Sequence, residues 1–290
     1  MKKILSILSV LLIFVNLSAQ DKQGLKVLIS VDMEGVTGVA NWKEVNRSGK
    51  DYDYFRKVMT LEANAAIEGV ARAGATTIVV RDAHGSARNI LPELLDRRAL
   101  LLREWSGSPQ SMVESVDETF DAVLCVGYHA KNGTPDATLD HTMSSKNIRN
   151  VEINGISLSE IGINALIAGY HEVPVIFVAG DQAVCDQSKV LFGVFETVAV
   201  KKGIGNAALN LHPAVAREKI TEGAEKALLN LKNYKPYKLQ PPYTLKLTLT
   251  HEQLANEKSY YPGVVKTGAW ELTFKSDDIM EVITAFSRMH

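Results

Sequence analysis

The sequence predicts an α/β fold, with a mainly parallel, Rossmann-like sheet as its core and a smaller C-terminal α+β subdomain. Short apolar runs rich in Val and Ile recur along the first two thirds of the chain. They lack the polar alternation of half-exposed strands, as expected when both faces of a sheet are covered. Helical patterns lie between the runs, and this succession of strands and helices indicates βαβ units and a parallel sheet.

The first 19 residues are predicted to be a cleaved secretory signal peptide rather than part of the fold. Two lysines precede an apolar run over residues 4–15, and residues 17–19 (LSA) offer a cleavage site of small residues. The run is about a dozen residues long, short of the roughly 20 that span a bilayer, which disfavours a retained anchor. We therefore expect export across the inner membrane to the periplasm, with no stable membrane anchor.

Residues 20–205 are predicted to form the core, which is also expected to bind metal. The candidate strands are the apolar runs Leu25–Val31, Thr76–Val80, Ala122–Gly127 and Val173–Ala179, with the less apolar Phe195–Val200. The candidate helices between them are Phe55–Arg72, Leu158–Tyr170 and Asp181–Phe192. In the first helix, apolar residues recur three and four positions apart, and Gly74 follows as a stop signal.

Residues 206–290 are predicted to form the smaller subdomain, because the pattern of the chain changes there. Pro213–Lys232 is typical of an amphipathic helix that begins with proline. Tyr243–Thr250 and Ala269–Lys275 alternate between polar and apolar residues, as half-exposed strands do, and Asp277–Met289 has a helical pattern.

Composition excludes several classes of protein. Thirty-two Lys and Arg against 33 Asp and Glu give a formal net charge of −1, so there is no broad basic excess for nucleic acid. Export permits a disulfide, but nothing in the sequence brings Cys125 and Cys185 together. Two buried free thiols are the preferred interpretation, and their pairing stays open.

Candidate metal ligands follow three of the predicted strands. Asp32 and Glu34 come after the first, His84 after the second and His129 after the third. The carboxyl ends of parallel strands share one edge of a sheet, so these side chains are expected to meet there. Two carboxylates so close repel each other unless a cation lies between them. Oxygen and nitrogen donors together suit zinc better than calcium.

Each of these residues also has a plainer interpretation. An Asp at a strand end often caps the following helix, which is the preferred role for Asp181. Glu160 opens a predicted helix, where a Glu is favourable to the helix dipole, so a ligand role competes with that one. His141 lies in a loop after the third strand, from which it can approach the same edge.

Several segments resemble the zinc-dependent bacterial D-aminopeptidase family, metallopeptidases of the dipeptide-transport operon type. Ser30–Gly38 (SVDMEGVTG) is similar to the signature of that family. The similar segments that follow are Asp82–His84 (DAH), Gly127–Ala130 (GYHA), His141–Met143 (HTM), Gly155–Ala165 (GISLSEIGINA) and Pro174–Asp181 (PVIFVAGD). The resemblance covers about residues 25–290 in matching order. Asp140 before the histidine, and Ala83 and Gly85 beside His84, depart from the family pattern and leave substrate preference open.

The resemblance implies two Zn²⁺ ions per chain. In this sequence Asp32 would bridge both ions, Glu34 and His84 would complete one site, and His129 and Glu160 the other. His141 would be the catalytic residue beside them. The resemblance also implies a ring-shaped homodecamer and a fold of the predicted layout.

The predicted function is therefore an exported dinuclear-zinc aminopeptidase. It would hydrolyse short peptides with N-terminal D-amino acids by means of a metal-bound hydroxide. Two alternatives stay open. The same two-metal edge could cleave another ester or amide, a phosphoester included, with Arg81 and Lys131 near enough in sequence to bind phosphate. The chain could also be a non-catalytic periplasmic protein that binds peptide or metal.

Overall fold

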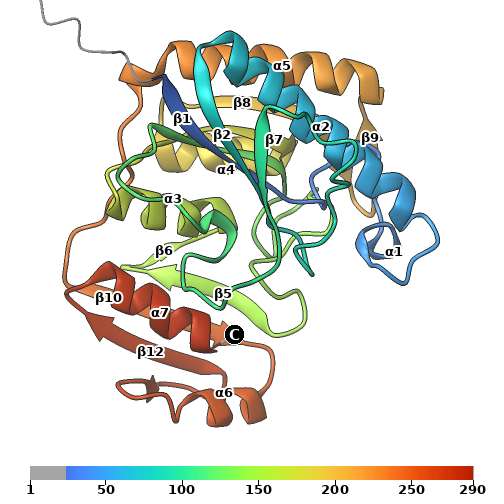
Figure 1. Cartoon of the computed structure of the whole chain (residues 1–290). Helices are drawn as coiled ribbons and strands as arrows, with labels where there is room; N and C mark the ends of the chain where they lie inside the picture. The colour runs from blue at the N-terminus through green and yellow to red at the C-terminus, as the bar shows by residue number, and fades with distance from the viewer. Residues whose placement is uncertain (1–23, 290) are drawn as a thin grey trace, which may run out of the picture.

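Two sheets organise the chain in the computed structural model, which describes residues 24–289 (Figure 1). The predicted signal peptide lies outside the described residues. None of the helices between residues 24 and 289 has the length and apolarity that a bilayer crossing requires.

The first sheet has seven strands in the order β3-β2-β1-β4-β7-β8-β9. All neighbouring pairs are parallel except β8 and β9, which form an antiparallel hairpin. The strands are β1 (Leu25–Val31), β2 (Ala75–Asp82), β3 (Ala99–Leu102), β4 (Ala122–Tyr128), β7 (Val175–Asp181), β8 (Glu196–Ile204) and β9 (Ala207–Asn210). The predicted parallel, Rossmann-like core is confirmed. The chain runs outward from β1 in both directions, so the strand order reverses between β1 and β4.

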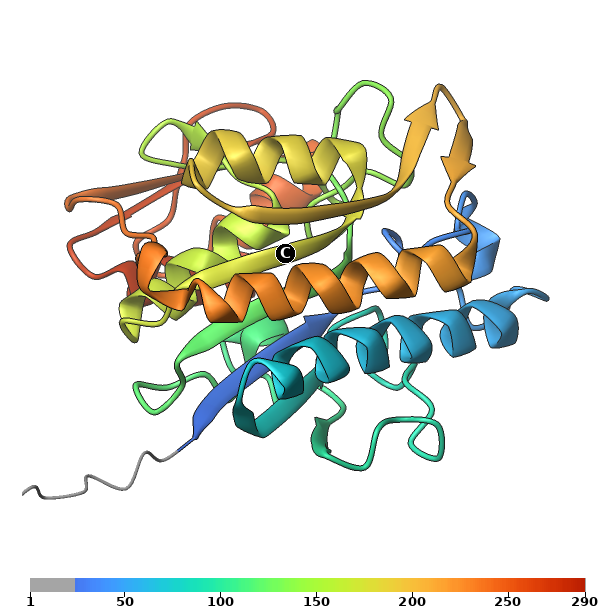
Figure 2. The same cartoon turned by 90° about the horizontal axis from the view of Figure 1, so that it is seen from above.

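Helices cover both faces of this sheet, which explains why its central strands β1, β4 and β7 are mostly apolar. Val27 and Ile29 of β1 pack in the core beneath α2 and α5, whereas Leu28 packs in the core on the opposite face. The helices are α2 (Tyr52–Arg72) and α5 (Pro213–Leu229) on one face, and α3 (Glu160–Tyr170) and α4 (Gln182–Phe192) on the other. Figure 2 shows α2 and α5 side by side.

The second sheet is smaller and antiparallel, with the order β11-β12-β10-β5-β6. Its strands are β5 (Ile148–Ile153), β6 (Ile156–Ser157), β10 (Tyr243–Leu249), β11 (Val265–Lys266) and β12 (Glu271–Ser276). Helix α7 (Ile279–Met289) packs on β10, β12 and α3. Buried residues of α3, the second sheet and one face of the first sheet share one core, so the two sheets are not separate bodies.

The sheets do not divide the chain at residue 206, where the smaller subdomain was predicted to begin. β9 and α5 follow that position and belong with the first sheet, whereas β5 and β6 precede it and belong with the second. In β5 the buried residues Ile148, Val151 and Ile153 are not in strict alternation, so the pattern did not indicate a strand. The second sheet therefore combines two distant parts of the chain.

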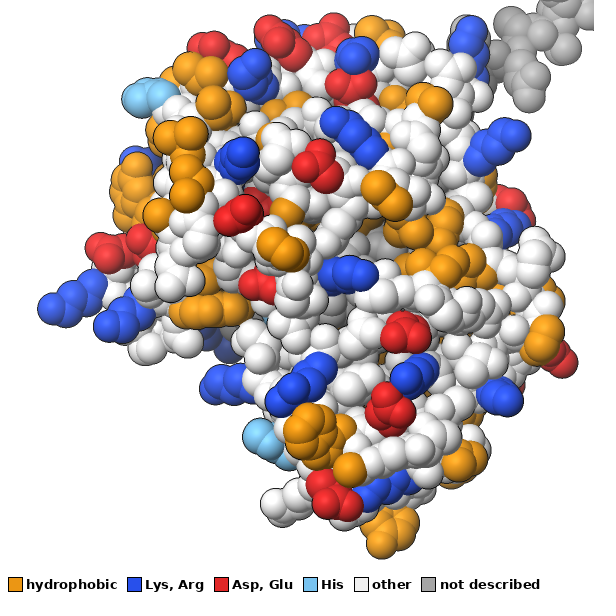
Figure 3. Space-filling model, turned by 180° about the vertical axis from the view of Figure 1, so that it is seen from behind, with side chains coloured by type: hydrophobic (Ala, Val, Ile, Leu, Met, Phe, Trp, Pro, Cys, Tyr) orange, Lys and Arg blue, Asp and Glu red, His pale blue; other side chains and the backbone are white. Residues whose placement is uncertain are grey.

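The remaining short helices are α1 (Trp42–Val45), α6 (Glu252–Lys258) and the 3₁₀ turns Ser111–Val113 and Leu231–Asn233. Cys125 and Cys185 are buried and free, as preferred from the sequence. On the face shown in Figure 3, acidic and basic side chains are interspersed among hydrophobic ones, in keeping with the formal net charge of −1.

Candidate metal centre

The predicted metal ligands meet at the carboxyl edge of the first sheet. Asp32 and His129 directly follow β1 and β4, the two strands between which the strand order reverses. His84 comes two residues after β2, and Glu160 is the first residue of α3. This edge is where parallel sheets of this type bind ligands, because the loops that leave the two strands separate there.

One group of donors consists of Asp32, Glu34 and His84. Nδ1 of His84 lies 3.2 Å from Oδ1 of Asp32 and 3.0 Å from Oε2 of Glu34. The relative exposure of the two acidic residues is 3% each, and that of His84 is 9%. Their donor atoms all lie within 4.8 Å of one another, which is the spacing of ligands around one ion.

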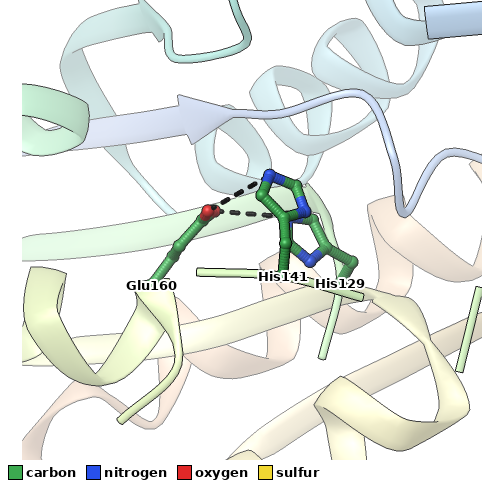
Figure 4. A group of neighbouring side chains, drawn as sticks. All are labelled: His129, His141 and Glu160. Carbon is green, nitrogen blue, oxygen red and sulfur yellow. Dashed lines mark ion pairs between the residues drawn. The ribbon is translucent and has the colours of Figure 1, made fainter. Parts of the chain in front are cut away.

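A second group consists of His129, His141 and Glu160 (Figure 4). Nε2 of His129 lies 3.4 Å from Oε2 of Glu160, and Nε2 of His141 lies 3.7 Å from Oε1 of the same carboxylate. The two imidazole rings are stacked, with centroids 4.1 Å apart. His141 is thus close enough to be a ligand or to act beside one.

Asp32 joins the two groups. Its Oδ1 faces His84, and its Oδ2 lies 3.4 Å from Nε2 of His129. One carboxylate therefore directs one oxygen into each group, which is the arrangement expected of a bridging ligand.

Each of the three imidazoles is oriented by a hydrogen bond from its other nitrogen to a backbone carbonyl. Nε2 of His84 donates to Val45 at 2.8 Å, Nδ1 of His129 to Ala130 at 2.9 Å, and Nδ1 of His141 to Leu139 at 2.9 Å. A carbonyl oxygen only accepts, so the proton of a neutral ring is held there. The remaining nitrogen then presents a lone pair to the carboxylates, as in histidines that bind metals.

The polar atoms at the centre of the cluster are incompletely satisfied. Nε2 of His129 and Oε2 of Glu160 are buried and have no hydrogen-bond partner among residues 24–289. Such orphaned atoms are rare in native interiors and point to an ion or ordered water between them. Three carboxylates and three imidazoles are a donor set that zinc accepts, so the residues present fit the metal that the sequence predicts.

The electrostatics of the cluster also favour a cation. Burial raises the pKa of Asp32, and the adjacent Glu34 raises it further. Burial lowers the pKa of His129, but Glu160 and Asp32 outweigh that effect and hold it well above its ordinary value. The carboxylates thus stabilise positive charge at the imidazoles, and a metal ion that takes this place displaces the protons.

Glycines allow the chain after β1 to cross the end of β4. The Gly35 amide donates to the Gly127 carbonyl at 2.7 Å, and a Cβ on Gly35 would lie 1.8 Å from the oxygen of Tyr128. Gly127 has a φ of +74°, which residues with a side chain rarely adopt. A Cβ there would lie 2.1 Å from the backbone oxygen of Asp32. Larger residues at either position would separate Asp32 from His129.

Two buried charged residues hold the loop after β1 and were not predicted from the sequence. Nζ of Lys201, on β8, donates to the carbonyls of Glu34 and Val39, the latter at 2.7 Å. Oε1 of Glu62, on α2, accepts from the Thr37 amide at 3.0 Å. Burial lowers the pKa of Lys201 to about 8 and raises that of Glu62 to about 7. In sequence both resemble ordinary surface charges.

Other acidic side chains near the cluster support the backbone instead of the centre. The Asp82 carboxylate accepts from the amides of Asn89 and Ile90, and Asn89 Nδ2 donates to the carbonyl of His84 at 2.6 Å. Asp140 accepts from the Gly133 amide at 2.6 Å, which fixes the loop before His141. Asp181 caps α4 through the Val184 amide, as expected.

The two cations considered for phosphate binding are engaged elsewhere. The Arg81 guanidinium is fully buried, donates to the carbonyls of Glu104 and Ser111, and stacks on Trp105. Nζ of Lys131 donates to the hydroxyl of Ser157 at 2.7 Å. Neither cation is therefore available to bind a phosphoester.

Comparisons with known proteins agree with this geometry. Residues 25–288 match the family described as D-aminopeptidase. The chain is 36% identical over 267 residues to a D-aminopeptidase of Bacillus subtilis (strain 168), an alignment that covers 90% of this chain and 95% of that protein. It is also similar to the solved structure of the Zn-dependent D-aminopeptidase DppA from Bacillus subtilis, described as a self-compartmentalizing protease. That similarity has a TM-score of 0.87, 33% identity, and coverage of 91% of this chain and 96% of the other.

In the wild type, ionisation of Glu62 is expected to lower stability as the pH rises from acid to neutral. Glu62→Gln should abolish this pH dependence. Burial raises the pKa of the Glu62 carboxyl from 4.5 to about 7. Its contribution to stability is therefore full below about pH 4.5 and is lost as the pH rises through 7. The free energy of unfolding of the variant minus that of the wild type should increase by about 1–3 kcal/mol from pH 5 to pH 8. Urea denaturation in the presence of a chelator measures it.

Glu68→Gln is the matched control on the same helix. Hydrogen bonds from Arg98 lower the pKa of the partly exposed Glu68, so its proton is lost mostly below this pH range. Its difference from the wild type should stay constant from pH 5 to pH 8. A constant difference for Glu62→Gln as well would contradict the assignment of a raised pKa to Glu62.

Proposed function

The chain belongs to the D-aminopeptidase family, and on that premise we propose an exported, dinuclear-zinc aminopeptidase that removes N-terminal D-amino acids from short peptides. The family and the similar structure make it a zinc-dependent metalloprotease. The export, the number of metals and the preference for D-residues are what we propose beyond that. Export rests on the predicted signal peptide at residues 1–19.

The observation that carries the dinuclear centre is the position of Asp32 between two donor groups. Glu34 and His84 would complete one zinc site, and His129 and Glu160 the other, with one Asp32 oxygen in each. Two ions so held would polarise the scissile carbonyl and activate water when bound.

His141 is the side chain that we assign to proton transfer. Its Nδ1 is held by the Leu139 carbonyl, so its Nε2 faces the pocket near Glu160 and has no hydrogen bond in the described chain. When the ring also carries a proton on Nε2, that N–H can stabilise negative charge on the attacked carbonyl or give its proton to the leaving amine. The Trp42 ring packs edge-on against the His141 ring, with the two centroids 5.4 Å apart.

We propose that the protein assembles into a homodecamer. DppA is described as self-compartmentalizing, which implies assembly of that protein around an enclosed space. In this chain, Ile204 and Leu209 of the β8–β9 hairpin are 59% and 66% exposed. The hairpin projects from the rest of the molecule in Figure 2 and offers apolar surface for contacts between copies.

Matched dipeptides test the activity and its stereochemistry. The zinc-loaded protein should cleave a dipeptide with N-terminal D-Ala faster than its L-Ala counterpart, by about tenfold or more in kcat/KM, which corresponds to ~1.4 kcal/mol between transition states. Chelation should abolish activity, zinc should restore it, and metal analysis should give two zinc ions per chain. No zinc-dependent cleavage of either peptide would refute the proposal.

Histidine variants test the separate roles of His129 and His141. His129→Ala should lose zinc from one site together with activity. His141→Ala should keep both zinc ions and the fold, while kcat falls by ~10²–10³-fold or more, as expected for a lost proton-transfer or oxyanion group. His251→Ala, at an exposed position far from the cluster in sequence, is the control and should match the wild type. Near-normal kcat in His141→Ala would remove its catalytic role, and loss of zinc would make it a ligand.

The mass of the purified protein tests the assembly. Sedimentation at micromolar concentration should give a particle of ten chains. Replacement of the apolar tip residues, as Ile204→Asp with Leu209→Asp, should shift the protein toward smaller species, because charge at an apolar contact is expensive to bury. A wild-type monomer under these conditions would rule out the decamer.

A further inference from the structure

An inner pocket opens directly onto the metal ligands. Its volume is ≈ 440 Å³, within the range of small-molecule sites. The cluster residues Asp32, Glu34 and Glu160 lie along it, and Trp42 and Trp105 are aromatic parts of its wall. A larger outer pocket of ≈ 960 Å³ adjoins it, since residues such as Trp42 and His84 line both.

Lys146 is the one lysine or arginine among the described residues that line the inner pocket. It also lines the outer pocket, so it stands where the two adjoin. No hydrogen bond or ion pair of its Nζ is present among residues 24–289. The three carboxylates of the pocket belong to the metal cluster, which leaves this ammonium without a counterion.

The backbone around Lys146 is fixed even though its side chain is exposed. The Thr250 hydroxyl donates to the Lys146 carbonyl at 2.8 Å, and the Thr250 amide donates to the Asn147 carbonyl at 3.0 Å. Within the turn, the Ile148 amide donates to the Ser144 carbonyl at 3.1 Å. Lys146 is therefore presented at a defined place and has only its side chain free to move.

These observations match the charges of a short peptide. Its free C-terminal carboxylate lies at the end of the molecule away from the bond at the metal ligands, and an unpaired cation in the same pocket would stabilise that charge. We propose that Lys146 binds the free C-terminal carboxylate of the substrate, an inference that rests on the proposed peptidase function. Because Lys146 and the metal ligands line the same small pocket, a peptide that reaches from one to the other within it must be short.

Nearby cations do not offer this contact. Arg81 and Lys131 are engaged with carbonyls and with Ser157, as described above. Arg47 is exposed and lines the outer pocket but not the inner one. Arg47 therefore provides a matched control: a cation near the site but outside the inner pocket.

The test compares a D-alanyl dipeptide with its C-terminal amide, which lacks the negative charge. For the wild type, kcat/KM should favour the free acid. Lys146→Met should raise KM for the acid by roughly 10–100-fold with little change in kcat, since a charge-assisted hydrogen bond is lost, and should leave the amide unaffected. Lys146→Arg should retain most of the preference, and Arg47→Met all of it.

Binding separates this inference from the peptidase proposal. A dipeptide in which CH₂–NH replaces the scissile amide, as free acid and as amide, is titrated into zinc-loaded wild type and Lys146→Met by calorimetry. A preference for the acid that disappears in the variant supports the role of Lys146, even if no peptide is hydrolysed. A preference that persists, or an equal loss for acid and amide, overturns it, even if the protein is an active peptidase.

Discussion

The crossing of the chain over the end of β4 is the contact on which the rest of the centre depends. The Asp32 amide donates to the Val126 carbonyl at 2.8 Å, and the Gly35 amide to Gly127 at 2.7 Å. These bonds continue the pairing of β1 and β4 beyond the carboxyl ends of the two strands. They bring the carboxylate after one strand against the imidazole after the other. Both glycines at the crossing are required by contacts too short for any side chain.

Around this crossing, two buried charged side chains from different elements hold the loop after β1. Glu62 and Lys201 reach the same loop from opposite elements, one from α2 and one from β8, and both bind its backbone. In the described chain, neither side chain forms a hydrogen bond with a metal-ligand atom of the cluster. The loop is thereby held by groups outside the cluster, and the cluster's own oxygens and nitrogens are left to face one another. Isolated buried charges would be costly, and the division between binding groups and supporting groups limits that cost.

The sequence was most informative where burial is complete. Leu25–Val31 matches β1 at both ends, because a strand covered on two faces is mostly apolar. The strand ends then located Asp32, His84 and His129 in space. Glu160 was ambiguous, since a first-turn Glu has a common structural role, and the resemblance to the family decided it. Lys201 and Glu62 could not be found, because their role depends on partners more than 20 residues away in the chain. β5 was missed because its buried residues do not alternate strictly along the strand.

The pairing of β5 with β10 has a consequence for the order of assembly. The segment that carries His141 and Lys146 connects β4 in the first sheet with β5 in the second, and it is tied down by Thr250. β5 has β10 as its long partner, which lies some ninety residues later. Until the last fifth of the polypeptide has been made, this segment lacks the contacts of β10 and Thr250, and contacts so distant in sequence form slowly. A nascent chain can therefore complete its parallel sheet before the second sheet fixes the segment of His141 and Lys146, so the candidate site reaches its final form only after β10 has paired.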